Sequence, residues 1–416
     1  MKIAVLGAGL AGVTTAWFLA RDGHEVVVID REQKVAAAAS RANGGIVASS
    51  RAFPWSSPQM ASTILRALYR NDQAVRLRFQ FDPHFWLWGL RFLASCSEEA
   101  FARILARKVR LVRYSQQELG RIIDETQLDY GRLTNGVLYI YRSAAALEKG
   151  VKRLALMQGQ GFRTRVLEPG EAVRVEPALA ASATRLAGVI HGETDEAGDS
   201  ARFCDALARR SGPLGVQYRF GCDIRGLETD GARVIAAATS AGRIEADAFV
   251  CALGVIEPAL RGAFGVPLPV YPVKGYSLTV PVVNAAAAPG HAGMDESKLI
   301  AFCPMQDSLR ITGGAEFAGY GMHGTEPDFR RLYEAAEELF PGATDYAAAS
   351  KWVCRRPMTH DSLPRFGTAR YANLWFNIGQ GHMGWAMAPG SARITADLIA
   401  GRQPAIALDG LLLAPR

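Results

Sequence analysis

The first thirty residues constrain the fold more than any other part of the chain. An apolar run over residues 3–6 leads into the sequence GAGLAG, with Gly7, Gly9 and Gly12, and a second apolar run, EVVVID, ends at Asp30. This order predicts a strand, a tight glycine turn, a helix and a second strand, which together form a Rossmann-type unit. The glycines permit the turn, the approach of a pyrophosphate and close helix packing, and Asp30 stands where an acid accepts hydrogen bonds from an adenosine ribose. We therefore predict that the chain binds a dinucleotide.

The C-terminal region indicates which dinucleotide is bound. The sequence NLWFNIGQGHMGWAMAPGSARITADLIAG predicts a strand, a second glycine turn containing Gly379, Gly381 and Gly384, and a helix. Backbone N–H groups at such a helix N-terminus would stabilise the negative charge that develops near N1 and O2 of a reduced flavin. A loop of small residues over 36–55 would let a large ligand lie against the backbone. These features favour FAD over a nicotinamide cofactor.

The overall composition is that of a cytosolic globular protein. The 416 residues are too many for one simple core and predict two domains. No apolar run reaches the ~20 residues that span a bilayer, and the N-terminus begins with a strand rather than a signal peptide. The six cysteines are scattered and the seven histidines have no ligand spacing, so we assign no metal.

Residues 58–128 show a helical pattern with two features that allow more than one interpretation. The stretch HFWLWGLRFL, with Phe85, Trp86, Trp88 and Phe92, reads as a core helix, or alternatively as a helix that docks on a membrane surface. The basic stretch RILARKVRLVR over 103–113 reads as a solvated helix face. A nucleic acid or an anionic membrane remains as the alternative partner for its charges, which contribute to the net charge of +7.

The remaining segments predict a second domain. Strands are expected around Asn135 and Gly136, a helix from Ala144 to Gln158, a helix capped by Asp199 or Ser200, and antiparallel strands within 271–281 and 298–319. The expected fold is α/β, with a Rossmann-type domain and a second α+β substrate domain whose sheet is mostly antiparallel. The first domain is assigned residues 1–57, 171–256 and 351–416, and the second is assigned 58–170 and 257–350.

Two adjacent arginines, Arg355 and Arg356, precede Pro357 in the sequence KWVCRRPMTHDSLPRFG. A guanidinium is protonated at any working pH, so a buried one needs an anion. The residues alone leave open whether that anion belongs to the protein or to a substrate.

Five motifs occur in one order along the chain, and together they carry a resemblance to a known family. They are GAGLAG with VIDRE, SRANGG, VYPVKGYSLTVP, RRPMTHDSLP and NLWFNIGQGHMGWAMAPGS. In this order they resemble bacterial FAD-dependent D-amino acid dehydrogenases, members of the D-amino acid oxidase superfamily, essentially from end to end. The resemblance implies FAD as cofactor and oxidative deamination of D-amino acids to 2-oxo acids and ammonia, by hydride transfer from the α-carbon to flavin N5. It also implies a quinone-type electron acceptor and contact with the cytoplasmic face of the inner membrane.

The resemblance also implies roles for individual residues. Arg356 matches the arginine that grips the substrate carboxylate, while Arg355 is expected in an ion pair. The substrate site is expected to include Tyr271, Lys274, Tyr276 and His360. The expected cofactor residues are Gly7, Ala8, Gly9, Leu10, Gly12, Asp30, Arg31, Ser40, Asn43, Gly44, Gly45, Gly254, Gly379, Gly381, His382, Met383 and Gly384. The chain has PMTHDS and RANGGI where the family commonly has PMTPDG and SANAGQ, and these differences bear on the substrate range.

Three alternatives remain beside this interpretation. The first is an oxidase or dehydrogenase of glycine, sarcosine or a cyclic imino acid such as proline or hydroxyproline. The second is an RNA-binding flavoprotein that acts on a tRNA base; we expect no nucleic acid, because the basic residues are not interleaved with stacking aromatics. The third is a non-catalytic flavin subunit, against which the presence of Arg356 and the second glycine turn argues.

Overall fold

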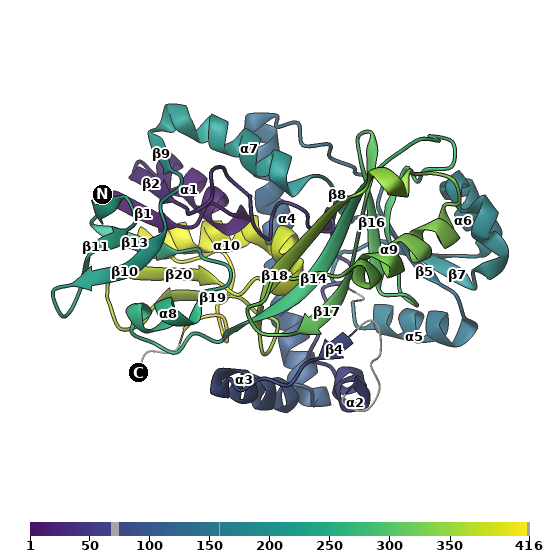
Figure 1. Ribbon diagram of the computed structural model, residues 1–416, viewed down its shortest axis with the longest axis horizontal. Helices are drawn as coiled ribbons and strands as arrows, with labels where there is room; N and C mark the ends of the chain where they lie inside the picture. Colours follow the sequence, from purple (N-terminus) through teal and green to yellow (C-terminus); the bar gives the residue numbers. More distant parts are fainter. Residues whose placement is uncertain (68–74, 158, 414–416) are drawn as a thin grey trace.

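Two large β-sheets form the two halves of the molecule (Figure 1). The computed structural model describes residues 1–67, 75–157 and 159–413. Within them the helices are α1 (Leu10–Arg21), α2 (Pro58–Ala67), α3 (Pro83–Ala94), α4 (Glu98–Thr126), α5 (Ala144–Ala155), α6 (Pro169–Val175), α7 (Ser200–Ser211), α8 (Pro258–Arg261), α9 (Glu326–Leu339) and α10 (Gly384–Ile399). Short 3-10 helices are η1 (Pro177–Arg185), η2 (Gly212–Leu214), η3 (Gly262–Phe264), η4 (Tyr346–Ala348) and η5 (Gly381–Met383).

The first half is built on a six-stranded sheet. Its order is β19 (Arg365–Thr368), β20 (Leu374–Ile378), β13 (Ala248–Cys251), β1 (Lys2–Leu6), β2 (Glu25–Ile29) and β9 (Val216–Arg219). All neighbours pair in parallel except β19, which is antiparallel to β20. The central strands are continuous apolar runs because both faces are covered, as in other parallel sheets. A three-stranded sheet of β10 (Ile224–Thr229), β11 (Val234–Thr239) and β12 (Gly242–Glu245) contributes to the core on one face.

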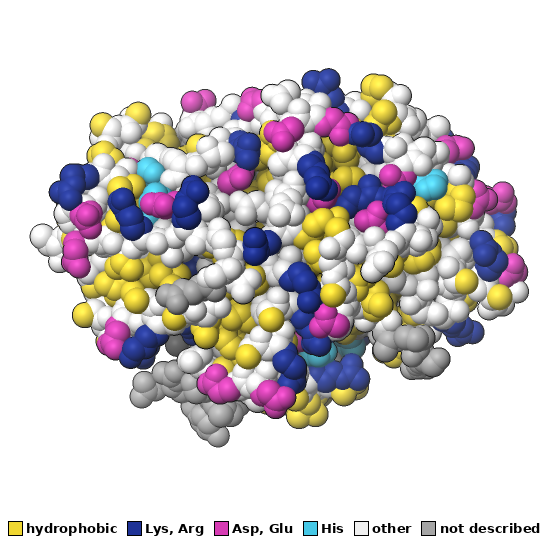
Figure 2. Space-filling model, turned by 180° about the vertical axis from the view of Figure 1, so that it is seen from behind, with side chains coloured by type: hydrophobic (Ala, Val, Ile, Leu, Met, Phe, Trp, Pro, Cys, Tyr) yellow, Lys and Arg dark blue, Asp and Glu magenta, His cyan; other side chains and the backbone are white. Residues whose placement is uncertain are grey.

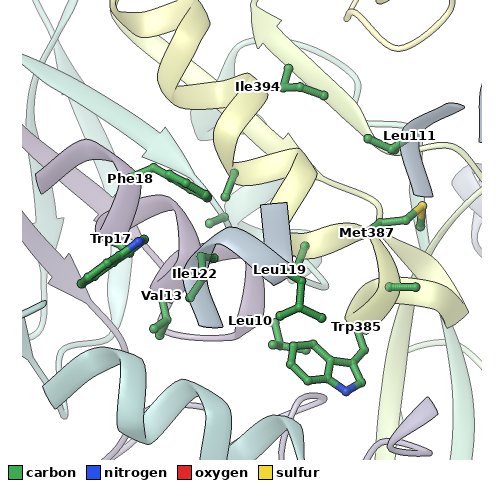
Figure 3. Close-up of a cluster of buried hydrophobic side chains, with 14 of the residues drawn as sticks. Leu10, Val13, Trp17, Phe18, Leu111, Leu119, Ile122, Trp385, Met387 and Ile394 are labelled. Atoms are coloured by element: carbon green, nitrogen blue, oxygen red, sulfur yellow. The ribbon is translucent and has the colours of Figure 1, made fainter. Parts of the chain in front are cut away.

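Helices α1, α4 and α10 form the core on the other face of this sheet (Figure 3). The side chains that meet there are Leu10, Val13, Trp17 and Phe18 from α1, Leu111, Leu119 and Ile122 from α4, and Trp385, Met387 and Ile394 from α10. Gly390 lets α10 approach α4, because a Cβ at this position would lie 2.8 Å from Ser115. The two glycine turns, before α1 and before α10, are thereby held by one packed unit.

The second half is built on a nine-stranded sheet. Its order is β18 (Ser350–Thr359), β14 (Val270–Pro281), β17 (Ser308–Phe317), β16 (Ile300–Met305), β15 (Ala292–Asp295), β5 (Val137–Tyr141), β7 (Gly188–Gly192) and β6 (Thr164–Leu167), with β4 (Val75–Leu77) paired to β17. Helix α9 packs on one face, and α3 packs against β14 and β17 on the other. A small ladder of β3 (Ile46–Val47) and β8 (Glu196–Ala197) completes the sheets.

The predicted fold class is confirmed, with corrections to individual elements. Asp199 caps α7 by accepting hydrogen bonds from two backbone N–H groups, as predicted. The predicted helix over 58–128 is interrupted, because residues 75–77 form β4, while residues 68–74 lie outside the described residues. Only the residues after Asn135 form a strand, since Leu133 makes a single bridge to Ala197. The predicted helix from Ala144 ends at Ala155, and Gln158 lies outside the described residues.

The domain boundaries stay predictions, and two of the assigned ranges contain strands of the other half. β7 lies within 171–256 but pairs in the nine-stranded sheet. β18 begins at Ser350 and also pairs in that sheet, although 351–416 was assigned to the first domain.

The prediction that the basic stretch 103–113 is a solvated face is wrong for one residue. Arg107 and Arg110 pair with Asp409, and both are partly accessible. Lys108, in contrast, is fully buried and donates to the backbone oxygen of Phe53 at 3.1 Å. On the face shown in Figure 2, Lys and Arg side chains are mixed with Asp and Glu rather than gathered in one patch.

The aromatic stretch of helix α3 has one buried and one exposed face. Phe85, Trp88 and Phe92 are buried against the sheet, whereas Trp86 and Leu90 are exposed. Among the described residues, no helix is long and apolar enough to cross a membrane.

Candidate active site

A cavity of about 1280 Å³ lies between the two halves and is lined by both. Its walls include Gly9 and Asp30 from the first sheet region, Gly381 from the second glycine turn, and Tyr139 and Thr312 from the nine-stranded sheet. The volume exceeds the roughly 300–1,000 Å³ of an ordinary small-molecule pocket. The cavity therefore has room for a large cofactor together with a small substrate.

The first glycine turn places a free helix N-terminus at this cavity. Gly7 has a φ of +108°, and a Cβ at Gly12 would lie 1.8 Å from the Gly7 oxygen, so neither position tolerates a side chain. Helix α1 begins after Gly9 without a side-chain cap. Its first N–H groups can therefore face an anion such as a pyrophosphate. Ser40 lies beside them, with its hydroxyl oxygen accepting from Leu10 N at 3.1 Å.

Asp30 supports the same turn. Its carboxylate accepts from Ala8 N at 2.6 Å and from Glu32 N at 2.9 Å. Asp30 and Arg31 both line the cavity. Asp30 therefore orders the glycine turn, and its carboxylate oxygens can accept further hydrogen bonds from a ligand in the cavity.

The small-residue loop packs on the nine-stranded sheet. Asn43 accepts from Gly45 N at 2.9 Å, and a Cβ at Gly45 would come within 2.7 Å of both Met305 and Cys303. Buried Arg310 donates to the backbone oxygen of Asn43 at 3.2 Å. Asn43, Gly44 and Gly45 line the cavity, so the loop presents backbone to a ligand there.

The second glycine turn lines another part of the cavity. Gly381 has a φ of +61°, and α10 begins at Gly384 without a side-chain cap. His382 stacks on Trp55, with ring centroids 4.8 Å apart and planes at 24°. Burial, with the charges of Lys108 and Arg356, lowers the pKa of His382 well below its usual value. The imidazole is therefore neutral near pH 7.

The two adjacent arginines have different environments. Arg355 forms an ion pair with Glu257 at 2.7 Å and donates to the backbone oxygen of Tyr320. Arg356 donates to the backbone oxygen of Gly314 at 2.7 Å and lies 6.0 Å from the Trp55 ring centre. Over the described part of the chain no carboxylate pairs with Arg356, although burial lowers its pKa. Since a guanidinium stays charged, the arrangement leaves a cation at the cavity that an external anion can pair with.

Strand alternation separates two of the predicted substrate residues, Lys274 and Tyr276, from Arg356. Arg356 is paired with Val273, whereas Lys274 and Tyr276 point to the face of β14 that α9 covers. There the Tyr276 hydroxyl donates to Glu316, and Lys274 pairs with Glu316 at 3.1 Å. Tyr276 still borders the cavity, but Lys274 does not line it.

Tyr271 and His360 also lie away from the cavity lining. Tyr271 is buried against Phe85 and Trp88, and within the described residues its hydroxyl has no hydrogen-bond partner. His360 lies 3.2 Å from the Ser95 hydroxyl. The predicted cofactor residues that line the cavity are Gly7, Gly9, Leu10, Asp30, Arg31, Ser40, Asn43, Gly44, Gly45, Gly254, Gly381, His382, Met383 and Gly384. Ala8, Gly12 and Gly379 do not line it and act on the shape of the turns.

Sequence reasoning missed several residues at or beside the site, among them Trp55, Gln380 and Lys108. Trp55 contacts both His382 and Arg356, and the only signal was an aromatic residue at the end of the small-residue loop. Gln380 lines the cavity and donates to Asn377. Lys108 did have a signal, because it lies four residues after Ile104 and three and four residues before Leu111 and Val112, a spacing that places it on the apolar face of α4.

The site as a whole fits FAD. Two helix N-termini whose N-cap residues make no side-chain hydrogen bond meet one large cavity, and side chains are excluded from both turns by positive φ or by close backbone. The described residues contain no group of three or more His, Cys, Asp or Glu side chains that could hold a metal.

Comparison with known proteins agrees with this class of site. The family described as FAD dependent oxidoreductase matches residues 2–398, and the chain belongs to this family. It is therefore an enzyme of the FAD-dependent oxidoreductase type, and its cofactor is FAD.

The relatives confirm the resemblance that the sequence motifs indicated. The chain is 40% identical over 413 residues to D-amino acid dehydrogenase 2 of Mesorhizobium japonicum, covering 99% of each chain. It is also 40% identical over 412 residues to D-amino acid dehydrogenase of Paramagnetospirillum magneticum, covering 99% of this chain and 98% of that one. Among solved structures, glycine oxidase from Geobacillus kaustophilus shares the fold with a TM-score of 0.74 at 20% identity, covering 100% of this chain and 99% of that one.

Proposed function

We propose that this enzyme oxidises D-amino acids, giving 2-oxo acids and ammonia. The observation that carries the proposal is Arg356, a guanidinium at the cavity whose hydrogen bond goes to a neutral backbone oxygen rather than to a carboxylate. Relatives named D-amino acid dehydrogenase, at 40% identity over nearly the whole chain, support it.

Arg356 would bind the substrate carboxylate through two parallel N–H···O bonds. This planar fork fixes the orientation of the α-carbon as well as the charge. With the carboxylate held and the α-hydrogen directed at the cofactor, the two enantiomers would differ by exchanging the positions of the amine and the side chain. A pocket that accepts the side chain on one side only would therefore distinguish them, and the named relatives are D-amino acid dehydrogenases.

The charge of the site affects how the substrate amine binds. His382 is neutral, so it adds no positive charge that would repel an ammonium group. The substrate amine has to lose a proton before the α-hydrogen leaves as hydride, so the rate rises with pH as the amine is deprotonated. When bound, FAD supplies the acceptor for this hydride, and a quinone would be the acceptor that re-oxidises the cofactor. The imino acid then hydrolyses in water.

Anaerobic reduction of the bound flavin tests the proposal. Absorbance of the purified holoenzyme would be followed after adding D- or L-alanine, D- or L-proline, glycine or sarcosine. Bleaching by D-amino acids at rates well above those of the L forms is expected. Bleaching by glycine, sarcosine or proline alone would assign the enzyme to the corresponding amine or imino acid reaction, and bleaching by none would contradict amine oxidation.

We further propose that α3 contacts an anionic membrane surface, where a quinone would be available. Phe79, Phe81, Trp86 and Leu90 are exposed on or just before this helix, and Phe81 is 95% exposed. Arg78 and Arg91 are exposed in the same segment. Aromatic and aliphatic side chains flanked by arginine are typical of segments that bind the interface of anionic bilayers.

A further inference from the structure

A β-bulge in β17 changes which side chains face the cavity beside Arg356. Leu309 and Ile311 point to the α9 face, so regular alternation would direct Ala315 and Phe317 there too. The pairing of β14 with β17 shifts register between Lys274 and Tyr276, and Gly314 has a φ of +74°. Such a bulge inserts one residue and reverses the faces of the residues beyond it.

Contacts on both sides of the strand confirm this reversal. Glu316 points to the α9 face, where it pairs with Lys274 and accepts from Tyr276. Ala315 and Phe317 instead pack with α3 and line the cavity. The same bulge presents the Gly314 oxygen to Arg356. The bulge therefore supplies both the acceptor of Arg356 and the two redirected side chains, while Arg356 itself lies on β18.

The redirected residues complete an apolar surface beside Arg356. We call it the apolar wall, and it consists of Trp55, Met60, Ile64, Phe92, Ala315 and Phe317. These side chains line the cavity and pack around one cluster that also contains Val75. Trp55 lies 6.0 Å from the Arg356 guanidinium, and Ala315 follows the residue to which Arg356 donates. The apolar wall therefore lies next to the position that the substrate carboxylate would occupy.

The cavity has a different character away from Arg356. There Arg51 pairs with Glu296 and donates to Tyr141, while its guanidinium lies 4.6 Å from the Tyr139 ring centre. The lining residues Arg51, Glu296 and Tyr139 belong to this polar region. The apolar wall beside Arg356 has no charged side chain, in contrast to this polar region.

We infer that the apolar wall binds the substrate side chain and selects large neutral side chains, such as those of D-methionine, D-leucine and D-phenylalanine. This inference rests on the proposed function, since it takes Arg356 as the carboxylate site. Burying an apolar side chain against the wall is favourable, whereas a charged side chain there would lose hydration against six residues that carry no charge. Acidic and basic D-amino acids are therefore poor substrates.

A substrate panel on the wild-type holoenzyme tests the inference. Rates of anaerobic flavin reduction would be measured over a range of concentrations for D-methionine, D-leucine, D-phenylalanine, D-glutamate and D-lysine. We expect the second-order constant for D-methionine to exceed that for D-glutamate by about 10²-fold, the scale of a site that leaves a polar group unpaired. Reduction by D-glutamate or D-lysine as fast as by D-methionine would overturn the inference while leaving the proposed function intact. Reduction by no D-amino acid would overturn the proposed function itself.

A matched pair of variants tests whether the apolar wall determines the preference for neutral side chains. Met60→Lys adds a cation to the apolar wall and is expected to raise the D-glutamate to D-methionine ratio by at least ~10-fold. Met294→Lys makes the same change in the polar region of the cavity lining, on β15 and two residues before Glu296, and it should leave the ratio unchanged. The same shift in both variants, or in neither, would contradict the assignment. Flavin content of each variant, measured from the absorbance spectrum, shows that it is folded.

Discussion

The guanidinium of Arg356 lies directly over Gly275, where a Cβ would come within 2.5 Å of its carbon and nitrogen atoms. Gly275 pairs with Cys354 and Val273 pairs with Arg356, so the arginine leans across the neighbouring strand to reach the Gly314 oxygen. Because Gly275 has no side chain, the guanidinium of Arg356 can occupy this position at the cavity.

Replacing this glycine should affect substrate binding more than cofactor binding. In Gly275→Ala, the methyl group displaces the guanidinium, so the fork no longer meets the carboxylate in the same orientation. We expect KM for D-amino acids to rise by at least ~10-fold, with unchanged FAD content. The matched control is Gly226→Ala in β10, where a Cβ meets no atom within 4 Å. An unchanged KM in Gly275→Ala would contradict the positioning role.

The two adjacent arginines should respond differently to the same substitution. Arg356→Lys keeps the positive charge but loses the planar fork, and we expect kcat/KM to fall by ~10²-fold or more. Arg355→Lys alters the pair with Glu257 and should leave kcat/KM within a few-fold of wild type. Steady-state kinetics with an artificial electron acceptor would measure both variants. A larger loss in Arg355→Lys would reassign the carboxylate site.

Asp30 should be needed for cofactor affinity. In Asp30→Asn, one of the two backbone N–H groups that the carboxylate accepts would face an amide N–H instead. Leaving such a donor unpaired costs about 1–3 kcal/mol, so we expect the FAD dissociation constant to rise by at least ~10-fold. Titration of the apoprotein with FAD, followed by quenching of flavin fluorescence, measures this constant. Equal dissociation constants would show that the carboxylate does not order the turn.

Buried Lys108 should make stability depend on pH. Burial lowers the pKa of Lys108 from 10.5 to about 7. Because the unfolded state keeps this proton to higher pH, it binds more protons than the folded state between those values, and the free energy of unfolding rises with pH. Relative to Lys108→Met, the wild type should gain on the order of 2 kcal/mol between pH 7 and pH 9.

Chemical denaturation of both proteins at the two pH values measures this difference. The variant also loses the hydrogen bond to Phe53, but that loss is common to both pH values and cancels in the comparison. A difference in stability that stays constant with pH would contradict a neutral Lys108 in the folded state at pH 9.

The exposed face of α3 should bind anionic vesicles. Leu90 is 67% exposed, and Leu90→Glu places a negative charge on that face. We expect this variant to lose sedimentation with phosphatidylglycerol vesicles while keeping its activity with a dye acceptor. Leu214→Glu, on η2, is the control and should sediment like the wild type. Failure of the wild type itself to sediment with these vesicles would contradict the membrane contact.

Local parts of the site were predictable from the sequence. The turn at Gly7, Gly9 and Gly12 could be recognised from residues close together in the chain, since Gly7 has a φ of +108° and a Cβ at Gly12 would lie 1.8 Å from the Gly7 oxygen. The second turn before α10 was found on the same grounds. The family resemblance then indicated Arg356, which the structure places at the cavity, whereas Lys274 lies outside the lining.

By itself, the sequence determined the elements whose conformation depends on neighbouring residues: the strand–turn–helix units, the cap at Asp199 and the apolar strands. Tertiary structure alone decided which side chains reach the cavity. Periodicity predicts faces only while a strand is regular, and the bulge at Gly314 reverses the faces of Ala315 and Phe317 because of how β14 and β17 pair. Lys108 and Trp55 depend in the same way on long-range packing, because burial and ring stacking are set by segments far apart in the chain.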